Sequence, residues 1–137
     1  MSKASTVVPG TVAATGQQIL KEVFGSFTEV QTALLATPDG FVIAAHGVPP
    51  NKDGAQMAAM ASSMMAMAMA RAVATEIGHS GSRRLTFETD DGTAIFQSVP
   101  SEFPCILCLV VRKDGVLGRA LWAVGEASSQ MASRLHL

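Results

Sequence analysis

The chain has 137 residues, the size of one domain that can bury a core without disulfide or metal staples. Ten basic and eleven acidic residues give a formal net charge of −1, and no basic run is longer than Arg83-Arg84, so the composition does not favour nucleic acid or an acidic membrane surface as a partner. Charged residues make up only 15% of the chain and hydrophobic residues 48%, so we expect another chain to cover part of its apolar surface.

The N-terminal segment, residues 1–11, is short, polar and proline-containing, and we expect a disordered tail there before a single domain over residues 12–137. It contains one lysine but no unbroken apolar run, so it predicts neither a signal peptide nor a membrane anchor, and we expect a cytoplasmic protein. An amphipathic helix that ends near residues 25–26 is predicted next. It rests on the helical spacing of Ile19, Leu20, Val23, Phe24 and Phe27.

Two strand-like runs follow, over residues 30–37 and 41–46, with Pro38-Asp39-Gly40 between them. Asp-Gly between two such runs is a strong signal for a hairpin of antiparallel strands. Pro49 and Pro50 then stop the second strand before the next helix.

The longest helical pattern covers residues 54–77, which are rich in Ala and Met, both strong helix formers. Asp53 and Gln56 are spaced for a capping box at its start, and Gly78 suits its end. No residue from 55 to 70 is charged. A helix without a polar face must be covered on two sides.

Two stripes run along this helix. The methionine stripe ends in Arg71, and we expect it to face a partner, with Ala58, Ala61 and Ala68 beside it to let a second helix approach closely. We expect the opposite stripe to face the chain's own core; it consists of Ser62, Ala66, Met69, Val73 and Ile77.

Two alternatives to a partner-facing helix remain. One is a central helix buried inside a monomer. The other is a membrane span, which a length of about 20 residues would allow. Gln56, Ser62, Ser63 and Arg71 interrupt the apolar run and argue against a span.

Cys105 and Cys108 are the only cysteines, and they lie in a continuous apolar run over residues 105–111 that predicts a buried central strand. Residues three apart on a strand point to opposite faces, so these thiols should neither bridge nor chelate a metal. The three histidines, His46, His79 and His136, lie apart without metal-ligand spacing. We therefore expect no metal site, and inert thiols.

Two more strands, over residues 84–89 and 93–99, precede the cysteine strand and are joined by Asp90-Asp91-Gly92. After it, Asp114 is expected to cap a final helix. The apolar stripe of that helix, weakened by Gly118 and Gly125, is Leu117, Leu121, Val124, Met131 and Leu135. The order therefore predicts an α+β fold: a single antiparallel five-stranded sheet, with the long helix on one face and the terminal helices on the other.

The order αββαβββα, the hairpin segment over residues 33–44 and the alanine-rich helix after it resemble the Roadblock, or dynein light chain, family in its bacterial branch. The resemblance spans residues 17–124 and implies a Roadblock/profilin-like three-layer sandwich. It also implies a homodimer in which the long helices pack together and the edge strands, residues 84–89, join two sheets. Family members are not enzymes; they bind and regulate small Ras-like GTPases or act as scaffolds. A member that activates its GTPase is expected to reshape the GTPase's own loops without inserting an arginine finger.

We therefore expect a homodimer whose interface residues are Met57, Met60, Ala61, Met64, Met67, Ala68, Arg71, Leu85 and Phe87. The expected function is regulation of a small Ras-like GTPase. The alternative is a profilin-like sensor module that binds a small ligand, because a fold alone does not decide function. An enzyme is not expected, since the sequence offers no Ser-His-Asp set, phosphate-binding loop or metal spacing, and no cofactor is expected either.

Overall fold

A computed structural model describes residues 8–48, 54–74 and 84–135, with the backbone alone for residues 67–74. The elements follow the order predicted from the sequence. They are α1 (Gly10–Phe24), β1 (Val30–Ala36), β2 (Val42–His46), α2 (Ala55–Ala74), β3 (Arg84–Thr89), β4 (Gly92–Val99), β5 (Cys105–Arg112) and α3 (Leu117–Arg134). Helix α1 thus begins two residues before the expected domain start. The expected roles of Asp53, Gly78, His79 and His136 lie outside the described residues.

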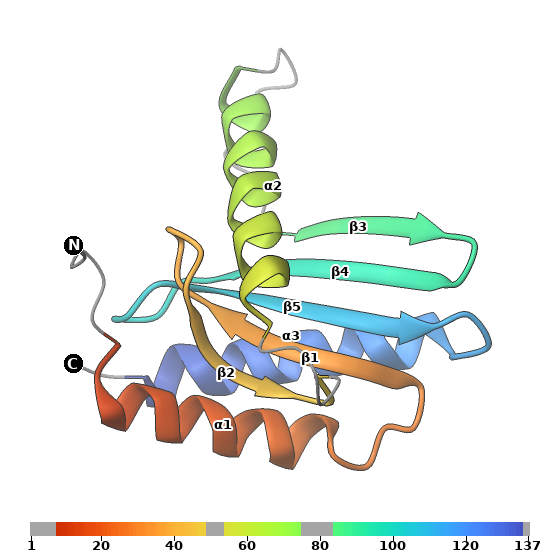
Figure 1. Cartoon of the computed structure of the whole chain (residues 1–137), viewed down its shortest axis with the longest axis horizontal. Coiled ribbons are helices and arrows are strands. Elements are labelled where there is room, and N and C mark those ends of the chain that lie inside the picture. The colour runs from red at the N-terminus through yellow and green to blue at the C-terminus, as the bar shows by residue number, and fades with distance from the viewer. Residues whose placement is uncertain (1–7, 49–53, 75–83, 136–137) are drawn as a thin grey trace.

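The strands form one five-stranded sheet in the order β2-β1-β5-β4-β3, and every neighbouring pair is antiparallel. The cysteine strand β5 is its central strand, as its continuous apolar sequence predicts. Figure 1 shows α2 on one face of the sheet and α1 with α3 on the other, so the predicted three-layer α+β arrangement is confirmed.

Side-chain alternation along β1 and β5 divides the core into two clusters, one for each face of the sheet. Leu35 and Leu107 pack with α1 and α3, whereas Leu34 and Ile106 pack with α2. Because both strands are covered on both faces, their sequences carry no polar face.

Helix α2 rests on the sheet through small residues, and the predicted core-facing stripe was wrong at Ser62 and Ala66. The side chains of Met69 and Val73, and Ile77 altogether, lie outside the described residues. Ala58, Ala61 and Met65 are the buried residues, whereas Ala66 is exposed and Ser62 is half-buried. Alanine lets the helix backbone lie close to the sheet, which a row of larger side chains would prevent. Helical periodicity could not choose between the stripes, because every face of this helix is apolar.

Helix α3 also differs from its prediction. Val116, not Asp114, precedes its first residue, and no side chain caps that end. Its buried residues are mainly alanines and leave Leu117 exposed: they are Ala120, Ala123, Val124, Ala127 and Met131. As in α2, alanine forms the contact surface where helix and sheet approach closely.

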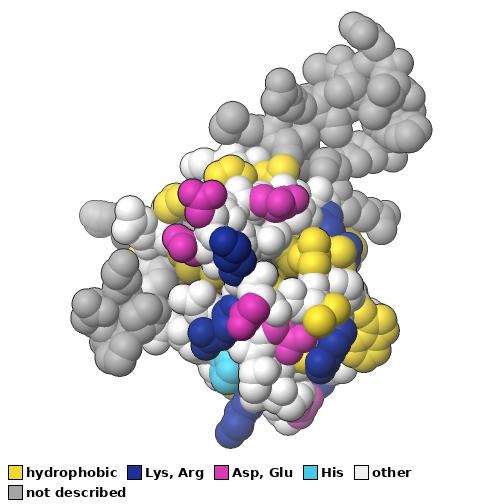
Figure 2. All heavy atoms as spheres, turned by 90° about the vertical axis from the view of Figure 1, so that its right-hand side faces the viewer, with side chains coloured by type: hydrophobic (Ala, Val, Ile, Leu, Met, Phe, Trp, Pro, Cys, Tyr) yellow, Lys and Arg dark blue, Asp and Glu magenta, His cyan; other side chains and the backbone are white. Residues whose placement is uncertain are grey.

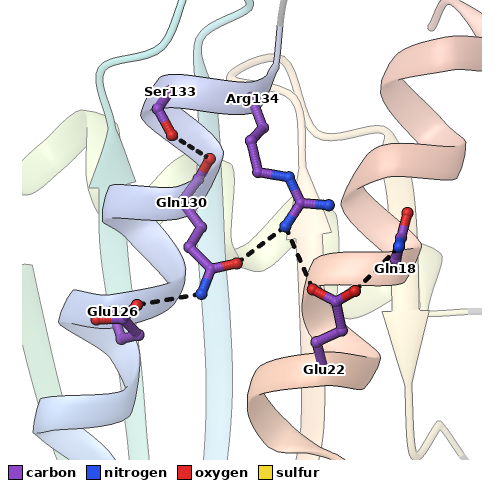
Figure 3. A network of polar contacts seen from close by, with 6 residues as sticks. All are labelled: Gln18, Glu22, Glu126, Gln130, Ser133 and Arg134. Atoms are coloured by element: carbon purple, nitrogen blue, oxygen red, sulfur yellow. Dashed lines mark hydrogen bonds and ion pairs between the residues drawn. The ribbon is translucent and has the colours of Figure 1, made fainter.

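Polar side chains join α1 to α3 on their outer side (Figure 3). Arg134 Nη1 donates to Glu22 Oε1 at 3.2 Å and to Gln130 Oε1 at 3.0 Å, while Gln18 Nε2 donates to Glu22 Oε2 at 2.9 Å. Gln18 and Glu22 are exposed and Gln130 and Arg134 are half-buried, and an ion pair that is reached by solvent contributes at most about 1 kcal/mol. The network therefore orients the two helices, while the apolar cluster beneath them supplies most of the stability.

Candidate functional site

One hollow in the described part of the chain lies between α2 and the sheet. It is an open apolar groove of about 1020 Å³. Met57, Met60 and Met64 line it from α2, and Phe87 and Phe96 line it from the sheet. Helix α2 crosses β1, β5 and β4 near one end, and no other described helix lies on that face (Figure 1). The groove exists because one helix is too narrow to cover five strands.

Large apolar side chains around this groove reach solvent. Met60 is 54% exposed and Phe87 is 50% exposed. Met60 lies on α2, which carries no charge from residue 55 to residue 70, and Phe87 lies on β3. An exposed apolar surface with a concave centre is typical of an interaction site.

Gly54 closes the groove at the start of α2. Its φ of +82° is in the left-handed region, and an added Cβ would lie 2.6 Å from Leu34 Cδ1. A residue with a side chain would be strained there, and the buried side chain of Leu34 would have to shift to make room for it. The glycine thus lets the chain turn into α2 close to Leu34.

The two edge strands of the sheet differ. At the β2 edge, Gln17 Nε2 donates to the carbonyl oxygen of Ala45 at 2.8 Å, and the N–H of Ala45 donates to Gln17 Oε1 at 3.2 Å. At the other edge, all residues of β3 except Leu85 are exposed. The groove therefore continues toward an edge strand that no described helix seals.

The end of the molecule that contains the β3–β4 turn has a mixed surface. Figure 2 shows acidic, basic and hydrophobic side chains interspersed on this side, without an extended basic area. A second, more polar hollow of about 430 Å³ lies between the start of β1 and the start of α3. Its Arg119 already pairs with Glu29 at 3.5 Å and lies over the ring of Phe27 at 5.1 Å.

The two thiols are structural. Cys105 packs in the α1/α3 cluster and Cys108 in the α2 cluster, so they point to opposite faces as predicted. Burial raises the pKa of each thiol to about 12, although a hydrogen bond with Ser101 opposes the shift at Cys105. Protonated, buried thiols are poor nucleophiles and poor ligands. Among the described residues, no three His, Cys, Asp or Glu side chains cluster closely enough to hold a metal ion.

Five of the nine predicted interface residues gather around the groove. Met57, Met60, Met64 and Phe87 line it, and half-buried Leu85 packs in the cluster beneath α2. Ala61 is fully buried against the chain's own sheet. Met67, Ala68 and Arg71 lie where side chains are not described.

The sequence reasoning missed the floor of the groove. Ala94 and Phe96 on β4 and Val110 on β5 line it on the α2 side. Alternation in β4 could have identified the first two, because Ala94 is paired with Phe87 and Phe96 with Leu85. No described helix is long and apolar enough to cross a membrane.

A sheet with one crossing helix on one face and two terminal helices on the other is the architecture that Roadblock domains share with profilin. The chain belongs to the Roadblock/LC7 family, because the model of the Roadblock/LC7 domain matches residues 17–103. No curated protein sequence matches the chain.

Solved structures agree on the fold. The gliding protein MglB from Thermus thermophilus is 20% identical, with a TM-score of 0.80 and coverage of 98% of each chain. A Roadblock/LC7 domain from Streptomyces avermitilis is 16% identical, with a TM-score of 0.75 over 85% of this chain and 94% of that one. Profilin IA from Acanthamoeba castellanii is 16% identical, with a TM-score of 0.54 over 85% of this chain and 96% of that one.

Proposed function

We propose that this chain is a non-enzymatic regulatory protein that forms a homodimer and binds a small Ras-like GTPase. The observation that carries the proposal is the unfilled apolar groove that runs from α2 to an open strand edge, on a domain of the Roadblock/LC7 family. Regulation through protein binding is what the family resemblance implies.

A second copy of the chain is the occupant that suits the groove. Fully burying a Met or Phe side chain contributes about 1.5–3 kcal/mol, so covering half-exposed Met60 and Phe87 contributes roughly half of that for each residue. Symmetry doubles this gain, because each copy offers the same two residues. The uncharged part of α2 lets two such helices approach without burying an unpaired charge.

The GTPase surface would then be shared between two copies. We expect binding to require the dimer, and we expect any acceleration of nucleotide hydrolysis to come from rearranged GTPase loops. The test uses purified Ras-like GTPases from the same organism and measures complex formation by size-exclusion chromatography and nucleotide hydrolysis by phosphate release.

Three kinds of protein are compared: the unchanged chain, the dimer-breaking variant Met60→Arg, and the single variants Arg112→Ala and Arg119→Ala. Binding by the unchanged chain but not by Met60→Arg supports the shared surface. Intact binding with lost acceleration in one arginine variant would reveal an arginine finger and contradict the fingerless mechanism. If no encoded small GTPase binds, the proposal is wrong.

A small-ligand sensor is the second candidate, and the volume of the groove favours it. Ligand sites usually have about 300–1000 Å³, and the groove has about 1020 Å³ with largely apolar walls. Native mass spectrometry of the purified protein distinguishes the two candidates. A mass above that of the 14.2 kDa chain or its dimer indicates a bound metabolite, whereas a clean dimer mass supports a groove filled by the second copy.

A further inference from the structure

The first half of α3 carries an exposed apolar surface of its own. Val116 is 58% exposed, Leu117 is 37% exposed and Trp122 is 65% exposed, and we call these three residues the α3 patch. The buried side of the same part of the helix is mostly alanine, so its larger apolar side chains point to solvent. Single exposed hydrophobic residues are common, but several within one short segment are typical of an interaction site.

The groove beside α2 does not account for the α3 patch. Helix α3 packs with α1 against the opposite face of the sheet (Figure 1). A second copy seated in the groove therefore leaves the patch uncovered. A partner that covers the patch binds independently of the homodimer.

The polar hollow of about 430 Å³ adjoins the patch, because Val116 belongs to its lining. Arg112, Asp114 and Arg119 also line the hollow, and all three are exposed. The side chain of Glu29, which completes the charged lining, is only 9% exposed. One of the two acids of this hollow thus lies beneath the surface.

Positive charge dominates the surface next to the patch. Arg112, Lys113 and Arg119 are exposed cations, whereas Asp114 is the one exposed anion of residues 112–119. The second anion, Glu29, is buried and already pairs with Arg119. Figure 2 shows basic side chains beside hydrophobic ones at this end of the molecule. The combination of apolar surface and excess positive charge is complementary to an acidic, partly apolar partner.

Two arginines of the hollow are held in place and still have N–H groups to offer. Arg112 Nε donates to the carbonyl oxygen of Thr28 at 3.0 Å. The guanidinium of Arg119 lies over the ring of Phe27 at 5.1 Å, with its Nε 3.5 Å from Glu29 Oε2. No described residue accepts a hydrogen bond from the terminal nitrogens of either arginine. A guanidinium fixed in this way can bind a carboxylate with little further loss of side-chain freedom.

We propose that the α3 patch and the adjoining hollow form a docking surface for an acidic segment of another protein. Apolar side chains of that segment cover Trp122, Leu117 and Val116. Its carboxylates bind the free N–H groups of Arg112 and Arg119. Trp and Arg are the residues that most often dominate the binding energy of protein interfaces.

A membrane surface fits these features less well. Binding to anionic lipid needs a broad basic area, and acidic side chains are interspersed with basic ones on this side of the molecule (Figure 2). Half-buried Glu126, one helical turn beyond Trp122, adds a further negative charge. The hollow also favours a protein side chain that can enter it over a flat bilayer.

A display library of short random peptides, panned against the purified chain, provides the probes. Enriched peptides should combine aromatic or aliphatic residues with Asp and Glu. Trp122 is the only tryptophan, so binding of a tryptophan-free peptide should shift its emission to shorter wavelength and protect it from acrylamide. Vesicles of phosphatidylcholine and phosphatidylserine are the lipid probe and should cause neither change.

Substitutions test the apolar and the charged parts separately, with the anisotropy of a fluorescein-labelled peptide as the measurement. Trp122→Ala should weaken binding roughly 30-fold or more, as the loss of a central aromatic anchor does. Lys113→Glu reverses one exposed charge and should weaken binding roughly 2- to 10-fold, with a smaller effect at high salt. The matched controls are Phe41→Ala, which removes a 49% exposed aromatic residue elsewhere, and Lys21→Glu on α1. Both should leave binding unchanged.

Each remaining outcome counts against the docking surface. Enriched peptides without acidic residues contradict it, and so do peptides whose binding survives both Trp122→Ala and Lys113→Glu. A library from which no peptide binds also overturns it. A shift of Trp122 emission by the vesicles alone would assign the patch to lipid. The peptides should bind Met60→Arg as well as the unchanged chain, so a failure of the proposed homodimer or GTPase leaves this test intact.

Discussion

The side-chain amide of Gln17 meets the backbone of Ala45 with both of its polar atoms, donating at 2.8 Å and accepting at 3.2 Å. One side chain from α1 thus satisfies the backbone groups that another strand would otherwise bind. Protected edges are a general device against unwanted sheet extension. Here the device is present at β2, whereas all residues of the other edge strand, β3, except Leu85 are exposed.

Replacing Gln17 tests that device. In Gln17→Ala both hydrogen bonds to Ala45 are lost, and we expect the free energy of unfolding to fall by about 1–3 kcal/mol. The exposed β2 edge should also increase aggregation. Urea denaturation and static light scattering measure the two effects. Gln18→Ala, which removes one exposed bond to Glu22, should change neither.

Substitution of exposed Met60 on α2 tests whether the groove is a dimer interface. Met60 is 54% exposed in the single chain, so Met60→Arg should leave the fold intact. Burying an unpaired charge in a dimer interface costs about 3–5 kcal/mol, so the same substitution should dissociate the dimer. Sedimentation equilibrium gives the mass, and circular dichroism checks the fold. Ala66→Arg introduces the same charge at an exposed position across the helix and should remain dimeric. Equal masses for both variants would argue against the groove.

Thiol ionisation should make stability fall at high pH. The pKa of both thiols is 9.0 in the unfolded reference and about 12 in the folded chain, so the folded state holds its protons more tightly. This contribution to stability is complete below pH 9 and is lost as pH rises from 9 to 12. The slope is about 1.4 kcal/mol per pH unit for each thiol.

The measurement is urea denaturation at several pH values between 8 and 11, with Cys105→Ala as the matched variant. Its stability should depend less steeply on pH than that of the unchanged chain. At pH 8 a thiol reagent should label neither Cys105 nor Cys108 until urea is added. Rapid labelling of the native protein would show that the thiols are accessible.

The fluorescence of Trp122, the only tryptophan, reports on the side of the molecule away from the groove. Trp122 is 65% exposed on α3, which packs on the face of the sheet away from α2. Dimerisation through the groove should therefore leave its fluorescence maximum and its acrylamide quenching unchanged across a dilution series. A blue shift on association would place the contact on α3 instead. The variant Met60→Arg, which we expect to be monomeric, supplies the reference spectrum.

The sequence by itself determined the order of the elements and the burial of the central strand. The Asp-Gly turns define hairpins locally, and the continuous apolar run around Cys105 and Cys108 requires cover on both faces. Because side chains alternate between the two faces of a sheet, the spacing of three residues also placed the two thiols on opposite faces. Each of these inferences depends only on residues close together in the chain, whose geometry the backbone dictates.

Only the tertiary structure decided which face of α2 packs and which edge of the sheet stays open. Ala58 and Met60 are both apolar, so hydrophobicity could not rank them; the close approach of helix and sheet selected the smaller residue. Gln17 and Ala45 are 28 residues apart, and nothing near either one predicts their contact. Burial and edge protection arise between distant segments, because they depend on how the helices settle on the completed sheet.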